Sequence, residues 1–488
     1  MKKLRIKSVI FFFCFFLLLL TLNVFNISML SHRELSTAAS AQRKSTEQAG
    51  TCRGYIYDKN MIPLVNTPFN TAGNEFVSNP RYSNNSLCRH IVGYLYADGN
   101  GAYGLEKLYD NHLKNDTTVN ITRITDPFGN PIDSTPISKE NINYIPNQNL
   151  KITIDYKIQK IAEEAADEYL ERGAIVILET DSFDIAAAVS RPNFNQNDIQ
   201  SALTGEASPL MNKSLCSYNA GSIFKTITAA AILENGMHND IVYECNGIFS
   251  AEGKEFACNK HDGHGKLDFK TAYAKSCNCF FYKKGTEATG SAIIQTAKKF
   301  GLGRSLLNCN ISESNGFLPE RTIYSARECA NMSIGQGEIL ITPLQAANIM
   351  AIVANSGMSK KINLADSIID ERGAVIKNLR KKGDEKVISK ENAAILADMM
   401  REAVLEGTAQ RVQNGIVAVA GKTGTAQTGW MENGETMTHG WFCGFFPYDN
   451  PRYAMAVFAE NGKSGSEACI PLFRRIVLEI NKLYKMET

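Results

Sequence analysis

The chain begins with a long apolar stretch that differs from everything after it. Residues 8–31 carry no acidic or basic side chain, and residues 9–22 are almost entirely Phe, Leu, Ile and Val. As a helix, residues 8–31 would be roughly 36 Å long, which is enough to cross the hydrocarbon core of a bilayer. Residues 32–50 are rich in Ser, Ala, Gln and Thr without a hydrophobic period, so we predict a linker there.

The next segment, residues 51–148, predicts a small strand-rich domain. Short alternating stretches such as Gly54–Asp58 are separated by turns of Asn, Gly and Pro, and the segment contains no catalytic pattern. The pattern then changes, because Asp155 precedes apolar residues at helical spacing up to Leu170. This predicts a capped amphipathic helix. We therefore predict a second domain over residues 149–488.

Apolar runs in the second domain predict an antiparallel sheet covered by helices. Residues 173–179 and 184–189 flank a short turn, which is typical of a buried hairpin. Three further runs are expected to pair antiparallel, namely residues 416–425, 440–446 and 453–458. The apolar face of a helix over residues 469–484 should cover the sheet. The predicted fold class is therefore a multidomain α+β protein with an N-terminal transmembrane helix.

Charge and composition orient the chain and exclude some partners. A net charge of +2 over 488 residues gives no indication of nucleic-acid binding. Basic side chains in residues 1–7 precede the apolar stretch, so residues 1–7 should form a cytoplasmic tail and the remainder should lie outside the cell. A cleaved signal peptide is the alternative, but the small residues Ala39–Ala41 lie far beyond the apolar core. We favour an uncleaved single-pass anchor.

The chain has twelve cysteines, of which one lies in the apolar stretch, so at least one of the others is unpaired within the chain. Cys245 and Cys258 bracket a loop-like segment and are the better disulfide candidates. Cys277 and Cys279 are poor candidates, because they flank Asn278, a candidate site residue. Free thiols in a reducing habitat are an equal alternative. A C-x-x-H-x-x-H pattern ending at His264 suits zinc, but Cys245 lies far upstream for a compact ligand pair. The sequence therefore predicts no metal and no cofactor.

One serine opens an apolar run at helical spacing. Ser222 is followed three residues later by Lys225, and the run ends near Gly236. Residues three apart lie on the same helical face, so the Ser222 hydroxyl and the Lys225 amine form a candidate nucleophile and base. An S-x-x-K match is common by chance. Here it occurs at one serine alone and is followed, in order, by Ser276-Cys277-Asn278 and Lys422-Thr423-Gly424-Thr425.

The three motifs together suit acyl transfer through a serine. A serine hydroxyl needs a base to remove its proton. Lys225 can be that base only when it is neutral, a state favoured by burial and by a nearby cation such as Lys422. The Ser276 hydroxyl can pass a proton to a leaving amine, and Asn278 can hold Lys225 and a substrate amide. Ser222, Lys225, Ser276 and Asn278 are the predicted catalytic residues.

The third motif supplies the predicted substrate-binding residues. Lys422, Thr423 and Thr425 carry cationic and hydroxyl donors that suit a substrate carboxylate. Gly424 is expected to let the substrate backbone lie close to the strand.

The ordered motifs S-x-x-K, S-x-N and K-T-G are typical of penicillin-binding proteins and class A β-lactamases, although those lactamases carry Asp where Cys277 stands. Further stretches resemble class B penicillin-binding proteins, whose membrane-proximal pedestal begins R-G-x-I-x-D. These stretches are Arg53–Asp58, Ile91–Tyr94, Gly104–Asp110, Ser190–Phe194, Asn331–Gly337 and Thr342–Ala347. The resemblance covers nearly the whole chain, from the anchor to the last helix.

The resemblance implies a pedestal domain and a serine β-lactamase-like transpeptidase domain. Its substrate would be the D-Ala-D-Ala end of a peptidoglycan stem peptide. Ser222 would form an acyl-enzyme with release of D-Ala, and an amine of a neighbouring stem would accept the acyl group. β-Lactams would acylate the same serine, and backbone N–H groups of Ser222 and Thr425 would form the oxyanion hole. A glycosyltransferase domain has no room before residue 150, so a SEDS-type glycosyltransferase is the implied partner.

Two other functions fit the same motifs. A membrane-anchored serine β-lactamase would have to activate water; the chain has no E-x-x-L-N pattern for the class A mechanism, while a class D mechanism through a carbamylated Lys225 stays open. A penicillin-sensing receptor would need a cytoplasmic output domain, and only about seven residues precede the span. The choice of water or an amine as acceptor, and of a role in elongation, division or sporulation, is also left open.

Overall fold

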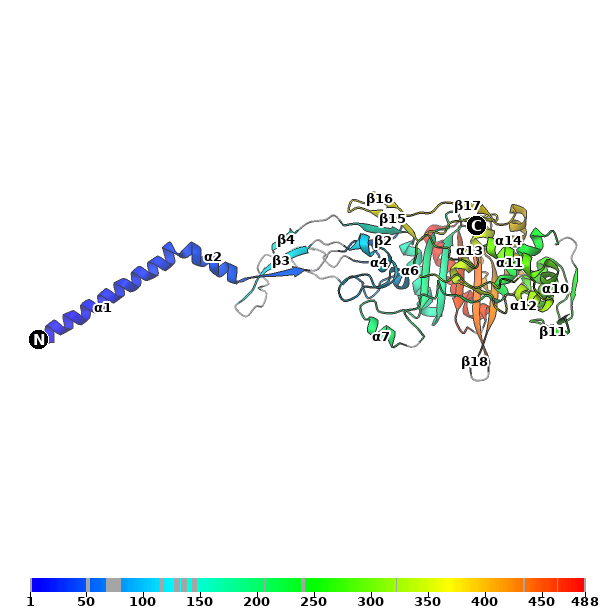
Figure 1. Cartoon of the computed structure of the whole chain (residues 1–488), viewed down its shortest axis with the longest axis horizontal. Coiled ribbons are helices and arrows are strands. Elements are labelled where there is room, and N and C mark those ends of the chain that lie inside the picture. The colour runs from blue at the N-terminus through cyan, green and yellow to red at the C-terminus, as the bar shows by residue number, and fades with distance from the viewer. Residues whose placement is uncertain are drawn as a thin grey trace. The chain divides into compact units, whose positions relative to one another are not determined.

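In a computed structural model, the chain divides into two compact units (Figure 1). The described residues are 2–49, 53–66, 80–114, 118–126, 132, 138–142, 147–205, 207–237, 242–321, 323–432, 435–462 and 464–486. The first unit comprises Met1–Cys52, Pro68–Asn79 and Asn115–Pro146, and the second comprises Arg53–Thr67, Pro80–Lys114 and Asn147–Thr488. The domain boundary between residues 148 and 149 stays a prediction.

The first unit opens with the expected apolar helix. Helix α1 (Lys2–Phe25) continues as a π-helical turn (Asn26–Leu30). The segment Leu4–Leu30 is long and apolar enough to cross a membrane, and its large apolar side chains are exposed. A helix that is hydrophobic all round and whose apolar side chains stay exposed among the described residues fits a membrane anchor.

Regular structure occupies most of the segment that we predicted as an irregular linker. Helix α2 (His32–Gln42) and strand β1 (Lys44–Ala49) cover it almost completely. Strand β1 pairs antiparallel with β3 (Thr118–Ile124), and β3 pairs with β4 (Ser138–Ile142). Alanine and glutamine are strong helix formers, which favours α2. The partner of β1 lies far along the chain and is not apparent from the local sequence.

A buried ion network lies near the start of the second unit. Glu106 is fully buried and accepts from Arg53 Nε over 2.6 Å and from Arg81 Nε over 2.8 Å. Arg53 Nη1 also reaches Asp110 Oδ1 at 2.7 Å, and Tyr82 OH lies 3.2 Å from Glu106 Oε1. Short elements surround this network, namely β2 (Ile56–Tyr57), α3 (Arg89–Val92), α4 (Gly104–Leu108) and α5 (Asp110–Leu113).

Replacing Glu106 by alanine is expected to lower the free energy of unfolding of this unit by about 3–5 kcal/mol, because the buried guanidinium of Arg81 would lose its carboxylate and that of Arg53 would keep only Asp110. Glu338→Ala is the matched control: its carboxylate pairs with Arg321 at 2.6 Å on the surface, where such a pair contributes about 0–1 kcal/mol. Denaturant unfolding of the full chain measures both. Equal losses in the two variants would contradict the prediction.

Five strands form the main sheet of the second unit, and all of them run antiparallel in the order β18-β19-β20-β6-β7. They are β6 (Gly173–Glu179), β7 (Ile185–Arg191), β18 (Ala420–Glu432), β19 (Glu435–Phe446) and β20 (Tyr453–Ala459). The predicted hairpin and the pairing of the three later runs are confirmed. The run predicted for residues 416–425 begins later than expected, because its strand starts only at Ala420.

Helices cover both faces of this sheet. Alternate residues of a strand point to opposite faces, and in β6 Ile175 and Ile177 join one apolar core while Val176 and Leu178 join the other. The first core is shared with α6 (Tyr156–Tyr169) and α16 (Ile470–Tyr484), and the second with α13 (Pro343–Ala354). The side chain of Asp155 accepts from two backbone N–H groups of α6, which confirms the predicted cap.

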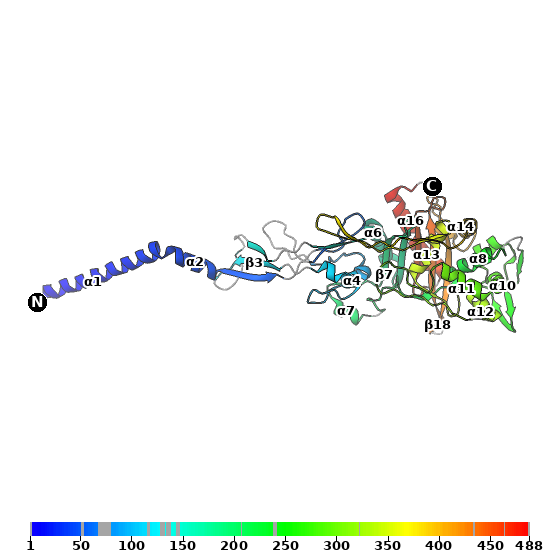
Figure 2. The same cartoon turned by 45° about the horizontal axis from the view of Figure 1, so that its top comes forward.

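Helices α10, α11 and α12 gather at the end of this unit opposite α4 (Figure 2). The remaining helices are α7 (Ile199–Leu203), η2 (Gly221–Phe224), α8 (Lys225–Glu234), α9 (Phe269–Ala274), α10 (Asn278–Ala288), α11 (Gly290–Lys299), α12 (Ala326–Ser333), α14 (Lys390–Leu405), η3 (Gln410–Val412) and α15 (Gly465–Ala468). The remaining strands are β5 (Asn149–Ile152), β8 (Tyr218–Asn219), β9 (Tyr243–Cys245), β10 (Ile248–Ala251), β11 (Lys254–Ala257), β12 (Gly265–Leu267), β13 (Leu340–Ile341), β14 (Met358–Lys360), β15 (Ala365–Ile369), β16 (Val375–Asn378) and β17 (Asp384–Lys386).

No cysteine in the described ranges forms a disulfide. Cys245 and Cys258, the predicted disulfide candidates, are free thiols with their Sγ atoms 3.8 Å apart, whereas a disulfide bond is about 2.05 Å long. Of the alternatives that the sequence left open for this pair, the disulfide is not formed.

Candidate active site

Ser222 lies in a tight turn that opens the predicted helix. The turn, η2, is a 3-10 helix that runs directly into α8, so the helix is present with a tighter start than predicted. Gly221 has a φ of +52°, and its N–H donates to Gly335 O over 3.0 Å. A Cβ on Gly221 would lie 2.8 Å from Thr425 O, and a Cβ on Gly335 would collide with Gly221 O. Backbone contacts on both sides therefore fix the turn that carries Ser222.

The Lys225 side chain is fully buried and connects the first motif to the second. Its Nζ donates to Ser276 O over 2.7 Å, to Ser276 Oγ over 3.2 Å and to Asn278 Oδ1 over 2.6 Å. Between Ser222 and Lys225, both within the described part of the chain, no hydrogen bond is recorded. The structure thus gives the predicted base three acceptors from the Ser276–Asn278 motif in place of the Ser222 hydroxyl.

The second motif forms a sharp turn between α9 and α10. Ser276 adopts a left-handed backbone conformation with φ +55°, which is unfavourable for a residue other than glycine. Cys277 is the N-cap of α10, and its Sγ accepts from Phe280 N over 3.5 Å. Asn278 is the first residue of that helix. This turn aims both the Ser276 and the Asn278 oxygen at the Lys225 amine.

The third motif lies on strand β18, next to the Ser222 turn. Lys422 is fully buried, and its Nζ donates to Thr423 O over 3.1 Å. The Thr423 and Thr408 hydroxyl oxygens are 2.6 Å apart, and the Thr425 side chain is exposed. The motif therefore presents two threonine hydroxyls on one side and keeps its lysine in the interior.

Gly424 lies where β18 packs against the turn of Ser222. A Cβ at this position would come within 2.9 Å of Ile223 Cγ1 and 3.1 Å of Trp441 Cβ. The missing side chain makes room for Ile223 and allows the turn to approach the strand. The expected role of Gly424 in admitting the substrate backbone stays a prediction.

One cavity of about 250 Å³ brings the three motifs together. Ser222, Ser276, Asn278, Thr423 and Thr425 all line it. Lys225 and Lys422 are not part of its lining and lie behind it. Sequence reasoning did not assign five other polar residues of the lining, namely Asn259, Gln336, Thr408, Ser464 and Ser466. Of these, only Gln336 carried a sequence signal, because it lies in the stretch Asn331–Gly337 that resembles class B penicillin-binding proteins.

Burial controls the charge of the two lysines. Loss of hydration lowers the pKa of Lys225 to about 7. The pKa of Lys422 is held well below its ordinary value, chiefly by burial and further by the charge of Lys225. A substantial fraction of Lys225 is therefore neutral near neutral pH, as a general base for Ser222 must be.

We expect the rate constant for acylation by a penicillin to rise with pH and to level off above a pH of about 7. Only the neutral Lys225 amine has a lone pair to take the serine proton, and its fraction falls about tenfold per pH unit well below the pKa. Stopped-flow acylation of the full chain at several pH values measures this. A rate constant that is flat between about pH 5 and 8 would contradict Lys225 as the base.

A five-stranded antiparallel sheet between helical layers, with these three motifs around one cavity, defines the class of serine enzymes that recognise penicillins. Residues 173–478 match the family described as "Penicillin binding protein transpeptidase domain". The chain belongs to this family. The fold class and the family expected from the sequence are thereby confirmed.

Curated relatives match most of the chain. Stage V sporulation protein D of Bacillus subtilis (strain 168) is 29% identical over an alignment of 404 residues, and the alignment covers 78% of this chain and 60% of the relative. Peptidoglycan D,D-transpeptidase MrdA of Acinetobacter baumannii is 27% identical over an alignment of 451 residues, and the alignment covers 79% of this chain and 64% of the relative. The chain thus spans 60% and 64% of the lengths of these two relatives.

Solved structures share the fold. Pseudomonas aeruginosa PBP2 in complex with WCK 5153 has a TM-score of 0.71 at 23% identity, with 89% of this chain and 96% of that chain covered. The imipenem acyl-enzyme complex of penicillin-binding protein A from M. tuberculosis has a TM-score of 0.72 at 25% identity, with 88% and 98% covered.

Proposed function

We propose that the chain is a peptidoglycan D,D-transpeptidase that forms its acyl-enzyme on Ser222 and is a target of β-lactams. The observation that carries the proposal is the single cavity that gathers residues of all three motifs, with the nucleophile Ser222 in its lining. A relative named peptidoglycan D,D-transpeptidase supports the reaction class. The acyl-enzyme complex of penicillin-binding protein A supports acylation by β-lactams.

Acylation begins when Ser222 Oγ attacks the carbonyl carbon of the penultimate D-Ala. The hydroxyl proton passes to the neutral amine of Lys225, and the backbone N–H groups of Ser222 and Thr425 stabilise the oxyanion. Because Lys225 Nζ lies 3.2 Å from Ser276 Oγ, the proton then passes through the Ser276 hydroxyl to the leaving nitrogen. The C–N bond breaks, and D-Ala departs.

Transfer reverses the proton path. An amine of a second stem peptide attacks the ester carbonyl of Ser222, and Ser276 returns the amine proton to Lys225. Collapse of the tetrahedral intermediate breaks the ester bond, and Ser222 Oγ regains its proton from Lys225. Asn278 holds the amine of Lys225 through its Oδ1 at 2.6 Å, and its N–H₂ group is free to bind the stem-peptide carbonyl.

The third motif binds the terminal carboxylate of the donor peptide. The hydroxyls of Thr423 and Thr425 are in the cavity lining and donate to the carboxylate oxygens. Lys422 is buried behind them. A bound carboxylate favours the protonated form of this lysine, because a nearby negative charge raises the pKa of an amine. Binding of the donor therefore also places a positive charge beside the site.

We place α1 across the cell membrane, with residues 1–7 in the cytoplasm and the catalytic domain outside, because the basic residues precede the span. The proposed domains are an anchor (8–31), a linker (32–50), a pedestal (51–148) and a transpeptidase domain (149–488). A structure described as a peptidoglycan synthase complex that coordinates polymerization and crosslinking shares the fold with a TM-score of 0.73. It supports a SEDS-type glycosyltransferase as the partner of this chain.

The proposal is tested on the full chain in detergent with a stem pentapeptide ending in D-Ala-D-Ala and a second peptide that offers a free amine. Mass spectrometry follows release of D-Ala and formation of the cross-linked product. We expect both to appear together, and preincubation with a penicillin should abolish both while adding the mass of the drug to the protein.

Other outcomes separate the rival functions. Release of D-Ala without a cross-linked product would identify a carboxypeptidase. Rapid destruction of the penicillin without a lasting adduct would identify a β-lactamase. A lasting adduct without any reaction of the peptides would identify a receptor. Each of these three results would overturn the proposal.

A further inference from the structure

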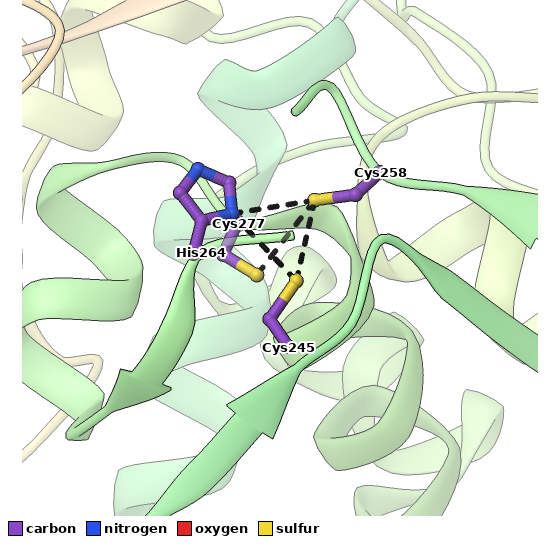
Figure 3. A group of neighbouring side chains, drawn as sticks. All are labelled: Cys245, Cys258, His264 and Cys277. Atoms are coloured by element: carbon purple, nitrogen blue, oxygen red, sulfur yellow. Dashed lines mark hydrogen bonds between the residues drawn. The ribbon is translucent and has the colours of Figure 1, made fainter. Parts of the chain in front are cut away.

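Three cysteines and one histidine meet beside the second motif. Figure 3 shows the Sγ atoms of Cys245, Cys258 and Cys277 and the Nδ1 atom of His264 turned toward one another, and these four atoms all lie within 4.8 Å of each other. The three cysteines are almost completely buried, and His264 is partly exposed. We call this set the Cys3His cluster. The proposed mechanism does not use any of its side chains.

The fold brings the cluster together from segments that are separate in the sequence. Strands β9 and β12 pair antiparallel, so Cys245 lies opposite Gly265 and next to His264. The β10-β11 hairpin then returns the chain, and Cys258 N donates to Gly247 O over 2.8 Å. The separation of Cys245 from His264 along the sequence argued against a metal site. Strand pairing nevertheless places the two residues next to each other in space.

The spacing of the four atoms matches a tetrahedral zinc site. With Zn–S bonds of about 2.3 Å and Zn–N bonds of about 2.0–2.1 Å, a tetrahedron has S···S edges of about 3.8 Å and S···N edges of about 3.6 Å. The Sγ atom of Cys258 lies 3.8 Å from both Cys245 Sγ and Cys277 Sγ. The Nδ1 atom of His264 lies 3.7 Å from Cys245 Sγ and 3.5 Å from Cys258 Sγ. All four distances agree with these edges.

The donor chemistry also selects zinc. Three sulfur donors and one imidazole form a soft ligand set that suits Zn²⁺ and excludes the oxygen-seeking ions Mg²⁺ and Ca²⁺. The environment offers hydrogen bonds to the sulfur atoms, because Phe280 N donates to Cys277 Sγ over 3.5 Å. Such contacts orient metal ligands. Four protein ligands leave no open position, so the ion would be structural.

We propose that Cys245, Cys258, His264 and Cys277 bind one zinc ion, which holds the second motif in its active conformation. Cys277 stands between Ser276 and Asn278, whose oxygen atoms accept from Lys225. A ligand bond at Cys277 ties this turn to β9, β12 and the chain after β11. The turn needs such support because Ser276 has a left-handed backbone, which is unfavourable for a residue other than glycine.

The cluster also reaches the cavity by a second route. Cys258 directly precedes Asn259 in the chain, and Asn259 is one of the residues lining the active-site cavity. Fixing Cys258 therefore fixes a wall of the cavity as well as the turn. Cys277 and its fellow ligands are positioning residues, because they act on the reaction through Ser276, Asn278 and Asn259.

Zinc binding is tested first, by metal analysis of the full chain purified in detergent under reducing conditions. We expect about one zinc ion per chain in the wild type and none in Cys245→Ser, a variant whose substitution lies outside the catalytic motif. The matched control is Cys329→Ser, since Cys329 is also a buried free thiol but lies outside the cluster; it should keep its zinc. Wild-type protein that retains no zinc after equilibration with equimolar Zn²⁺, or full retention by Cys245→Ser, would overturn the site.

The positioning role rests on the proposed function and has its own test. Zinc is stripped from the wild type with a chelator, circular dichroism checks that the fold persists, and acylation by a fluorescent penicillin is timed. We expect a fall of about 10–100-fold in the acylation rate constant, which equimolar Zn²⁺ restores and Mg²⁺ does not. Unchanged acylation of the zinc-free protein would overturn the positioning role. Absence of acylation in the zinc-loaded wild type would instead count against the proposed function, while the metal analysis still decides the site.

Discussion

Replacing Ser222 by alanine is expected to abolish covalent labelling by a penicillin, with a loss in acylation rate constant of about 10⁶-fold, the scale seen when a serine nucleophile is removed from another acyl-transfer enzyme. No other described group in the cavity lining has both a nucleophilic hydroxyl and a position at the start of the helix that carries Lys225. Intact-mass analysis of the full chain after incubation with the drug measures the loss.

Ser466→Ala is the matched control for this variant. Ser466 lines the same cavity, so its replacement tests whether removing any hydroxyl from the lining is enough. We expect labelling of Ser466→Ala within a few-fold of wild type. Because no hydrogen bond of the Ser222 side chain is recorded in the described part of the structure, Ser222→Ala should fold as the wild type does. A stable adduct on Ser222→Ala would show that the nucleophile lies elsewhere.

Replacing Lys225 by methionine is expected to lower the acylation rate constant by about 10⁴-fold, at the upper end of what loss of a general base costs. Methionine fills a similar volume without the amine, so Ser222 keeps its place and loses the group that takes its proton. The oxygen atoms of Ser276 and Asn278, which accept from Lys225 at 2.7 and 2.6 Å, lose their donor at the same time. Stopped-flow kinetics separate the acylation step from initial binding, and the loss should fall on the acylation step.

The control for Lys225→Met is Lys213→Met. Lys213 is also buried, and its Nζ contacts Ala207 O at 3.1 Å and Glu460 at 3.6 Å, away from the cavity. This variant should lose stability, because Glu460 loses one of its two cationic partners and keeps only Arg172 at 3.4 Å, while its acylation rate constant stays near that of wild type. A similar kinetic loss in both variants would mean that any buried lysine supports the fold of the site, and would contradict a chemical role for Lys225.

The sequence predicted the sheet and the gathering of the motifs because both have strong local signals. The apolar runs around residues 173–189 and 440–458 have the length and alternation of paired strands. The motifs S-x-x-K, S-x-N and K-T-G can be located directly from the sequence. Among the hydrogen-bond partners of Lys225, Asn278 was expected from the sequence to hold this lysine, and its Oδ1 accepts from Lys225 Nζ. The contacts of Lys225 with Ser276 O and Ser276 Oγ were not expected. They depend on the left-handed turn at Ser276, a conformation that a serine rarely adopts and that no local pattern indicates.

Long-range pairing explains the remaining differences. The helix and strand in residues 32–50 have no apolar period, and strand β1 is held by its backbone bonds to β3. Likewise, the antiparallel register of β9 and β12 brings Cys245 to His264, although the spacing in the sequence suggested that Cys245 was too remote. In both cases the structure depends on the pairing of two strands that are distant in the sequence. Neither strand alone has a sequence pattern that indicates its partner.

The close backbone contacts around the Ser222 turn limit which substitutions this protein can accept under selection by an acylating drug. Gly221 and Gly335 touch main chain to main chain, and a side chain at Gly335 would collide with Gly221 O. Substitutions at Gly221 or Gly335 would displace the Ser222 nucleophile and abolish the activity of the enzyme. Escape variants should therefore arise at the rim, where the side chains of Gln336, Thr408 and Ser466 line the cavity and can vary without moving the turn.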